Sequence, residues 1–182
     1  DEIIVRPTTV LVEGEDAVEE NFAVDAAEPL FTTTSAGNVR ARKHDGLHGG
    51  RASLLCTRAK PDGSYTALYR FTAPTASPYH LWVLEQGRPW ASPFEWRIDN
   101  GSWREAPTTL QMEGRRRVAK DGPTFAWSRL GEIELSAGQH RLEVRVTRSR
   151  DHDELFLLSQ DCFAFVVPAG EDEGRPFRYR HE

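Results

Sequence analysis

The sequence has only two cysteines, and it has no apolar run long enough to cross a membrane. Cys56 and Cys162 lie far apart and form no C-x-x-C pair, which excludes a zinc site built on paired cysteines. Both stand in apolar runs, SLLC and DCFAFVV. Two small buried side chains are therefore favoured over a single disulfide, which an oxidising compartment would allow. A membrane span needs roughly 20 consecutive apolar residues, so no membrane partner is expected.

An excess of positive charge is also missing. The chain has 23 Lys and Arg against 28 Asp and Glu, a formal net charge of -5. A general nucleic-acid binder carries a basic excess, so nucleic acid is not an expected partner. The 182 residues suit one domain, which we place over residues 1–170, with 171–182 as a polar tail or linker. The start, DEIIVRPTTV, resembles neither a signal peptide nor a Met start, so we expect a mature fragment or an excised domain.

Sustained helical periodicity is absent, and apolar residues alternate with polar ones instead. The alternation is clear over 64–71, 94–99, 132–135 and 140–147, and it predicts strands with one face on a core and one in water. Asp99-Asn100-Gly101-Ser102 predicts a hairpin, because Asn-Gly supplies the positive φ angles of a type I′ turn. Roughly ten strands at such spacing predict an all-β fold, an antiparallel β-sandwich.

The motifs of common catalytic sites are missing: there is no G-x-S-x-G, no H-E-x-x-H and no phosphate-binding glycine loop. His44 and His48 have the spacing of helical metal ligands, but the glycines around them indicate a loop, so a solvated or hydrogen-bonding loop is favoured over zinc. The sequence therefore does not indicate an enzyme. A small lyase or hydrolase would need His44, His48 or His152 to converge with Arg and Tyr residues in one groove.

Two groups of residues carry more information. Glu13 and Glu15 follow the first apolar run, and alternate residues of an extended strand point the same way, so both could face one hard cation. The alternative is a solvated acidic turn. Trp90, Trp103 and Trp127 stand near predicted turns, where an exposed ring suits stacking on a sugar. The alternative is that each ring folds back to cap the core.

Several segments, in order, resemble the galactose-binding-like jelly rolls of family 6 and family 35 carbohydrate-binding modules. TVLVEGEDA is similar to the V-E-A-E-D opening of that family, and GSYTALYRFTAP to G-x-Y-x-x-x-x-R-V-x-A-P. SPFEWRIDNGSW, FAWSRLGEIELSAGQHRLEVRVTRSRD and ELFLLSQDCFAFVVP follow in the family's order. The likeness spans residues 9–168 and implies a jelly-roll sandwich.

The resemblance also implies ligands. A structural calcium would be held by Glu13, Glu15 and a third acid at Glu154, where the family usually has Asp. The sugar cleft would take Trp127 and a second aromatic from the loop NVRARKHDGLHGG, which has none. That loop offers Arg40, Arg42 and His44 instead, so a bound glycan there would be a uronate or a sulfated sugar clamped by Arg.

The combined prediction is a noncatalytic carbohydrate-binding or accessory module of a secreted polysaccharide-degrading enzyme, extracellular or periplasmic. Its partners would be a polysaccharide or oligosaccharide and a neighbouring catalytic domain. The ligand-binding residues would be Trp127, Trp103, Trp90, Arg40, Arg42 and His44, and the metal ligands Glu13, Glu15 and Glu154. The alternative is a structural sandwich that packs on a catalytic domain, with no sugar binding of its own and with its loop tryptophans buried.

Overall fold

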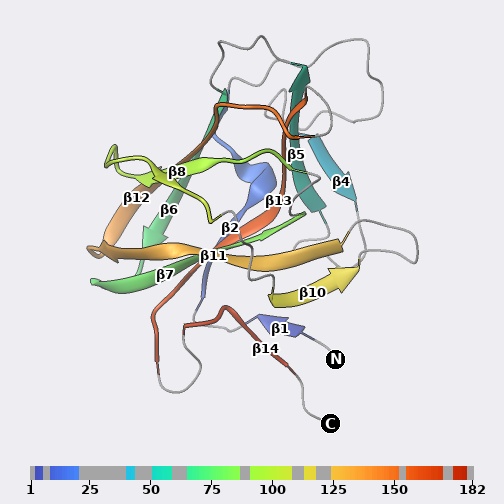
Figure 1. Cartoon of the computed structure of the whole chain (residues 1–182). Helices are drawn as coiled ribbons and strands as arrows, with labels where there is room; N and C mark the ends of the chain where they lie inside the picture. Colours follow the sequence, from blue (N-terminus) through green and yellow to red (C-terminus); the bar gives the residue numbers. More distant parts are fainter. Residues whose placement is uncertain are drawn as a thin grey trace.

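The computed structural model describes ten stretches of the chain and shows an all-β protein (Figure 1). They are residues 3–5, 9–20, 40–43, 51–58, 65–86, 91–107, 113–117, 124–151, 155–169 and 174–179. A single short 3-10 helix, η1 (Gly14–Asp16), is the one helical element within these stretches. None of the described residues belongs to a helix of the length and apolarity that crossing a membrane requires.

The larger sheet has seven strands. Their order is β10 (Glu113–Arg117), β11 (Thr124–Leu135), β7 (Ser77–Glu85), β13 (Leu155–Val166), β5 (Arg51–Arg58) and β4 (Arg40–Lys43), with β2 (Val10–Glu13) also paired to β13. All of these pairs are antiparallel. Strand β13 is therefore central: it pairs with β7 along one side, and with β5 and then β2 along the other.

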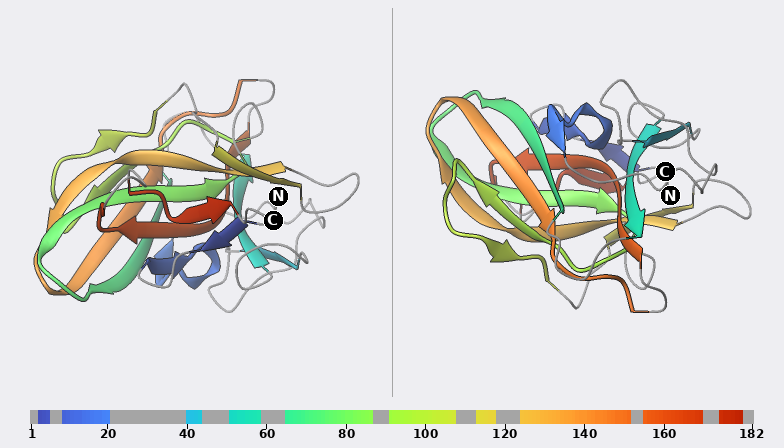
Figure 2. Two further views of the ribbon diagram at one scale, coloured as in Figure 1. Left: turned by 90° about the horizontal axis from the view of Figure 1, so that it is seen from below. Right: turned by 90° about the horizontal axis from the view of Figure 1, so that it is seen from above.

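The second sheet has five strands and packs face to face on the first (Figure 2). Its order is β3 (Glu19–Glu20), β6 (Tyr65–Ala73), β12 (Gly138–Val146), β8 (Glu95–Ile98) and β9 (Arg104–Glu105). The predicted antiparallel β-sandwich is thus confirmed. The strands expected from alternation over 64–71, 94–99, 132–135 and 140–147 correspond to β6, β8, the end of β11 and β12.

The main core lies between the two sheets and is built from the inward positions of alternating strands. Leu142, Val144 and Val146 are buried, whereas Arg141, Glu143 and Arg145 between them are only partly buried. Aromatic pairs join the sheets: the Phe71 and Phe165 rings stack with centroids 4.1 Å apart, and Tyr69 packs on Phe163 at 5.2 Å. The largest fully buried side chains of this core are Trp96, Tyr69, Tyr79, Phe163, Phe165, Leu81 and Leu142.

A second apolar cluster covers the outer face of the seven-stranded sheet. Trp82, Leu84 and Trp127 lie on this face with Phe177, which begins β14 (Phe177–Tyr179). Strand β14 pairs with β1 (Ile3–Val5) in a separate two-stranded sheet, visible beside β7 and β11 in Figure 1. The expected polar tail over 171–182 is therefore wrong for residues 174–179, because Phe177 is buried against the sandwich.

The predicted hairpin after β8 forms, but its turn begins one residue earlier than the Asn-Gly pair suggests. Asp99 and Asn100 have positive φ angles of 48° and 61°. Gly101 N–H donates to the Ile98 carbonyl at 2.8 Å and closes the turn. Asp and Asn tolerate the left-handed region better than other non-glycine residues, so Asp99 and Asn100 can form the two central positions of the turn. The Asp99 carboxylate then contacts β12.

Cys162 is a free, buried thiol on β13. The favoured prediction of unpaired cysteines is confirmed for this residue, and it therefore forms no disulfide with Cys56. Burial raises the pKa of the Cys162 thiol, and the nearby charges of Asp161, Glu13 and Glu15 raise that pKa further. The thiol is therefore protonated and behaves as a small apolar side chain.

Candidate functional site

Trp127 was predicted to line the sugar cleft, and the structure contradicts this. Its side chain is 1% exposed, and its ring stacks on Phe177 with centroids 6.2 Å apart and planes at 18°. The physical reason is the C-terminal segment, which folds back over the outer face of β7 and β11. Trp82 Nε1 donates to the Gly174 carbonyl at 2.8 Å and anchors this segment. Trp127 is therefore a packing residue.

Trp103 lies on the outer side of the five-stranded sheet and is half-buried. The guanidinium of Arg97 lies 4.4 Å from its ring centroid, and that of Arg145 lies 4.2 Å away. Each arginine also pairs with an acid on the neighbouring strand: Arg97 with Glu143, and Arg145 with Glu95. The ring therefore packs on a ladder of ion pairs between β8 and β12, and part of it remains accessible.

The other predicted ligand residues are not brought together by the described part of the chain. Arg40 and Arg42 lie on β4, at one edge of the seven-stranded sheet. Trp90, His44 and Glu154 lie outside the described residues. The roles predicted for these five residues in sugar and metal binding stay predictions.

Glu13 and Glu15, the two predicted metal ligands of the first strand, lie beside the middle of β13. Glu13 pairs with Cys162 across β2 and β13, and Glu15 follows in η1. One carboxylate oxygen of each is buried, as is one oxygen of Asp161, whose side chain is fully buried. The chemistry of this donor set fits a hard cation such as calcium, which prefers carboxylate oxygens.

The distances between these carboxylates suit a metal ion less well than their chemistry does. Within the described ranges, no three His, Cys, Asp or Glu side chains converge as a ready metal site. The three carboxylates lie near enough to Cys162 to raise the pKa of its thiol together, so they form one local concentration of negative charge. A cation here would have to draw Glu13, Glu15 and Asp161 closer.

Sequence reasoning did not select Asp161, although the signal was present. Asp161 is the charged residue inside the apolar run LFLLSQDCFAFVV, and charged residues are rarely fully buried unless they are paired or bind a metal. It also lies at a register shift between β13 and β7, between Gln160 and Cys162. Such bulges redirect a side chain.

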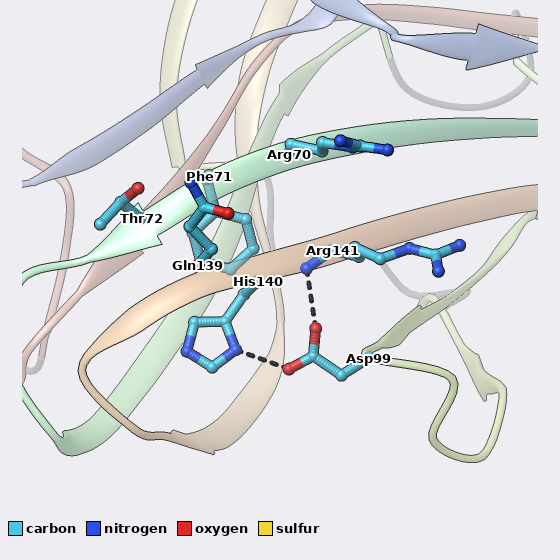
Figure 3. A pocket seen from close by; sticks show the side chains of 7 residues that line it. All are labelled: Arg70, Phe71, Thr72, Asp99, Gln139, His140 and Arg141. Carbon is cyan, nitrogen blue, oxygen red and sulfur yellow. Dashed lines mark hydrogen bonds and ion pairs between the residues drawn. The ribbon is translucent and has the colours of Figure 1, made fainter.

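A pocket of about 480 Å³ lies where β6, β12 and the turn after β8 meet (Figure 3). Its lining consists of Arg70, Phe71, Thr72, Asp99, Gln139, His140 and Arg141. Asp99 Oδ2 lies 2.5 Å from His140 Nδ1, and Asp99 Oδ1 accepts the Arg141 backbone N–H at 2.8 Å. This carboxylate therefore ties the β8 turn to β12.

His140 has acceptors at both ring nitrogens, because Nε2 lies 2.8 Å from the Ser136 carbonyl oxygen. Burial lowers the pKa of His140, but the hydrogen bonds to Asp99 and Ser136, with the Asp99 charge, outweigh it and raise the pKa above 6.5. The protonated form can donate to both acceptors at once. The site thus favours an imidazolium.

The Asp99–His140 pair predicts a pH dependence of stability. A histidine whose pKa is raised on folding stabilises the folded state below its unfolded pKa of about 6.5, and this contribution is lost as the pH rises through the folded value. The urea midpoint of the wild-type protein should therefore fall as the pH rises above about 6.5. In Asp99→Asn, burial prevails and this fall should become shallower or reverse.

The measurement is a series of urea unfolding curves across neutral pH, followed by tryptophan fluorescence. His140→Gln is the matched control, because it removes this titration and leaves the other histidines in place. Equal slopes in the wild type and both variants would show that the pair does not contribute.

The fold and these geometries define an antiparallel β-sandwich with a charged outer face and an acidic site on its central strand. No protein-family model matches the sequence, and no curated protein sequence matches it. Solved structures do match. An exo-β-1,3-galactanase from Phanerochaete chrysosporium with β-1,3-galactotriose has a TM-score of 0.51 at 8% identity, covering 86% of this chain and 29% of its own.

Two further structures carry the name of family 35. A GH26-CBM35 β-(1,4)-mannanase from Podospora anserina has a TM-score of 0.49 at 15% identity, covering 91% of this chain and 28% of its own. A family 35 carbohydrate-binding module from Clostridium thermocellum has a TM-score of 0.49 at 12% identity, covering 88% of this chain and 98% of its own. The galactanase match shows a shared fold. This chain spans less than a third of either enzyme.

Proposed function

We propose that this protein is a noncatalytic carbohydrate-binding module of a secreted, polysaccharide-active enzyme. The observation that carries the proposal is the agreement of motif order with strand order. Within the resembling segments, VLVE, YTALYRFTA, EWRI and LSQDCFAFV lie in β2, β6, β8 and β13 of one sandwich. The fold shared with the galactanase supports it. Fold alone does not fix function, so binding has to be measured.

The glycan we propose is acidic. Support comes from the basic strand β4, with Arg40 and Arg42, and from His44 directly after it. Arginine suits carboxylate and sulfate groups because its planar donors bind two oxygens at once. The aromatic contacts would come from Trp103, whose ring is partly accessible, and from Trp90.

Affinity gel electrophoresis tests this function. We expect the wild-type protein to be retarded in gels that contain a uronate-rich polysaccharide, and less so in gels with its neutral counterpart. Trp103→Ala should weaken the retardation if its ring stacks on the sugar, and Phe94→Leu, a buried core change, should leave it intact. A folded protein that is retarded by no polysaccharide would overturn the proposal.

We also propose that calcium stabilises the fold, held by Glu13, Glu15 and Asp161. The predicted ligand Glu154 lies outside the described residues and stays a prediction. Support comes from the three carboxylates gathered around Cys162 and from their buried oxygens. A bound ion would supply positive charge that offsets their mutual repulsion. No sugar contact is assigned to it.

A second candidate function is a structural sandwich that packs on a catalytic domain and binds no sugar. The burial of Trp127 favours it, because this reading expects the loop tryptophans in the core or at a domain surface. The same gels separate the two functions, since a spacer shows no retardation.

A further inference from the structure

Two arginines stand directly opposite each other on the outer face of the five-stranded sheet. Arg70 of β6 and Arg141 of β12 are register partners, and like charges directly opposite on neighbouring strands destabilise a sheet. Figure 3 shows both side chains extending the same way along their strands. The two positive charges therefore lie close together on the same face of the sheet.

The acids around these arginines neutralise them incompletely. Arg70 has no ion pair with any residue of the described ranges. Arg141 contacts Glu143 at 3.6 Å, but Glu143 makes its closer ion pair with Arg97. Arg141 Nε is buried and has no acceptor among the described residues. Because this Nε is enclosed, an anion would contact the outer nitrogens of the Arg141 side chain, which is 43% exposed.

The pocket also has uncharged polar residues in its lining, on the side of the two arginines away from their guanidinium groups (Figure 3). Thr72 and Gln139 are a register pair next to Arg70 and Arg141, and both line the cavity of about 480 Å³. The hydroxyl and the amide can each donate a hydrogen bond. Asp99 is the acid among the lining residues. Its carboxylate already contacts His140 and accepts the Arg141 backbone N–H.

The charges that face the pocket sum to a positive value. Arg70 and Arg141 are always charged, and the raised pKa of His140 favours its imidazolium, which balances Asp99. The negative charge of Glu143 offsets part of the positive charge of Arg141. The site therefore has spare donors and spare positive charge, which together suit an anion.

We propose that the neighbouring guanidinium groups of Arg70 and Arg141, at the edge of this pocket, bind an oxyanion, the carboxylate or sulfate group of an acidic saccharide. The saccharide part rests on the proposed function, whereas the oxyanion part stands on the arginine pair alone. This site lies on the five-stranded sheet, where β12 begins, whereas the basic strand β4 is at one edge of the seven-stranded sheet. It is therefore a second contact for an acidic chain.

The test is a titration followed through the arginine Nε–H signals in ¹⁵N NMR spectra. Sodium sulfate is added at constant ionic strength, with sodium chloride as the compensating salt. We expect saturable shifts of the Arg70 and Arg141 signals. Arg70→Gln should weaken binding at least about tenfold, since a charge-assisted hydrogen-bond pair is lost. Arg148→Gln, at an exposed arginine beyond the end of β12, is the matched control and should bind like the wild type.

Galactose 6-sulfate and glucuronate, each compared with galactose, identify the source of the anion. Shifts at lower concentration with the acidic sugars than with inorganic sulfate support the saccharide assignment. Binding of inorganic sulfate alone overturns that assignment, and the absence of any saturable shift overturns the site itself. Retardation by a neutral polysaccharide that persists in Arg70→Gln would keep the proposed function while this inference fails, so the two failures are distinguishable.

Discussion

Phe177→Ala is expected to lower the free energy of unfolding by about 3–5 kcal/mol, the usual cost of removing a buried phenylalanine. Phe177 is 2% exposed and contacts both Trp82, edge to face at 6.3 Å, and Trp127, stacked at 6.2 Å. Its loss leaves a cavity between β14 and the seven-stranded sheet and opens both indole rings to water. Urea unfolding with tryptophan fluorescence measures this directly.

Two further variants serve as comparisons for Phe177→Ala. Val167→Ala, at a residue 38% exposed just after β13, should change the free energy of unfolding by no more than about 0.5 kcal/mol. Gly174→Ala should destabilise like Phe177→Ala, because a Cβ there would lie 2.2 Å from His80 Nδ1 at a φ of +66°. A Phe177→Ala variant as stable as the wild type would mean that the C-terminal segment does not cover the sheet.

The effect of Asp161→Asn on the stability of the fold is expected to change sign when calcium is added. In a chelator, the variant should be more stable than the wild type, because it removes one of three carboxylate charges gathered at a buried thiol. With calcium at about 100 times its dissociation constant, the wild type should gain about 2.7 kcal/mol. The variant should gain much less, because it lacks one ligand charge.

Thermal unfolding of both proteins, with calcium and with a chelator, measures this crossover. Asp16→Asn is the matched control, because Asp16 is an exposed acid next to Glu15 and should respond to calcium like the wild type. Magnesium is the matched ion, since its demand for a small octahedral site makes it a poorer fit. A wild-type protein that calcium does not stabilise would contradict the proposed metal site.

Local sequence patterns predicted the strands because a half-buried sheet imposes a period of two residues. The alternation of Leu142, Val144 and Val146 with charged neighbours is such a pattern, and β12 follows it. Turn chemistry predicted a hairpin after Ile98, yet not its exact register, because Asp99, Asn100 and Gly101 all tolerate positive φ angles. Which two adopt them depends on the contacts that Asp99 makes with β12.

The functional residues were harder to predict because they depend on contacts between distant segments. Trp127 stands near a turn in sequence, and its burial follows from Phe177, fifty residues later in the chain. Arg70 and Arg141 become neighbours through the pairing of β6 and β12. A single sequence does not specify such register, so the covered tryptophan was predicted only as the alternative to a sugar cleft, and the arginine pair was not predicted.

The central claim, binding of a polysaccharide without cleavage, is tested most directly by calorimetric titration with oligosaccharides cut from an acidic polysaccharide. We expect saturable binding with a dissociation constant between about 1 μM and 1 mM, which is about 4 to 8 kcal/mol. The account also predicts that no new reducing ends form during prolonged incubation. New reducing ends, or a folded protein that gives no binding heat with acidic or neutral oligosaccharides, would contradict it.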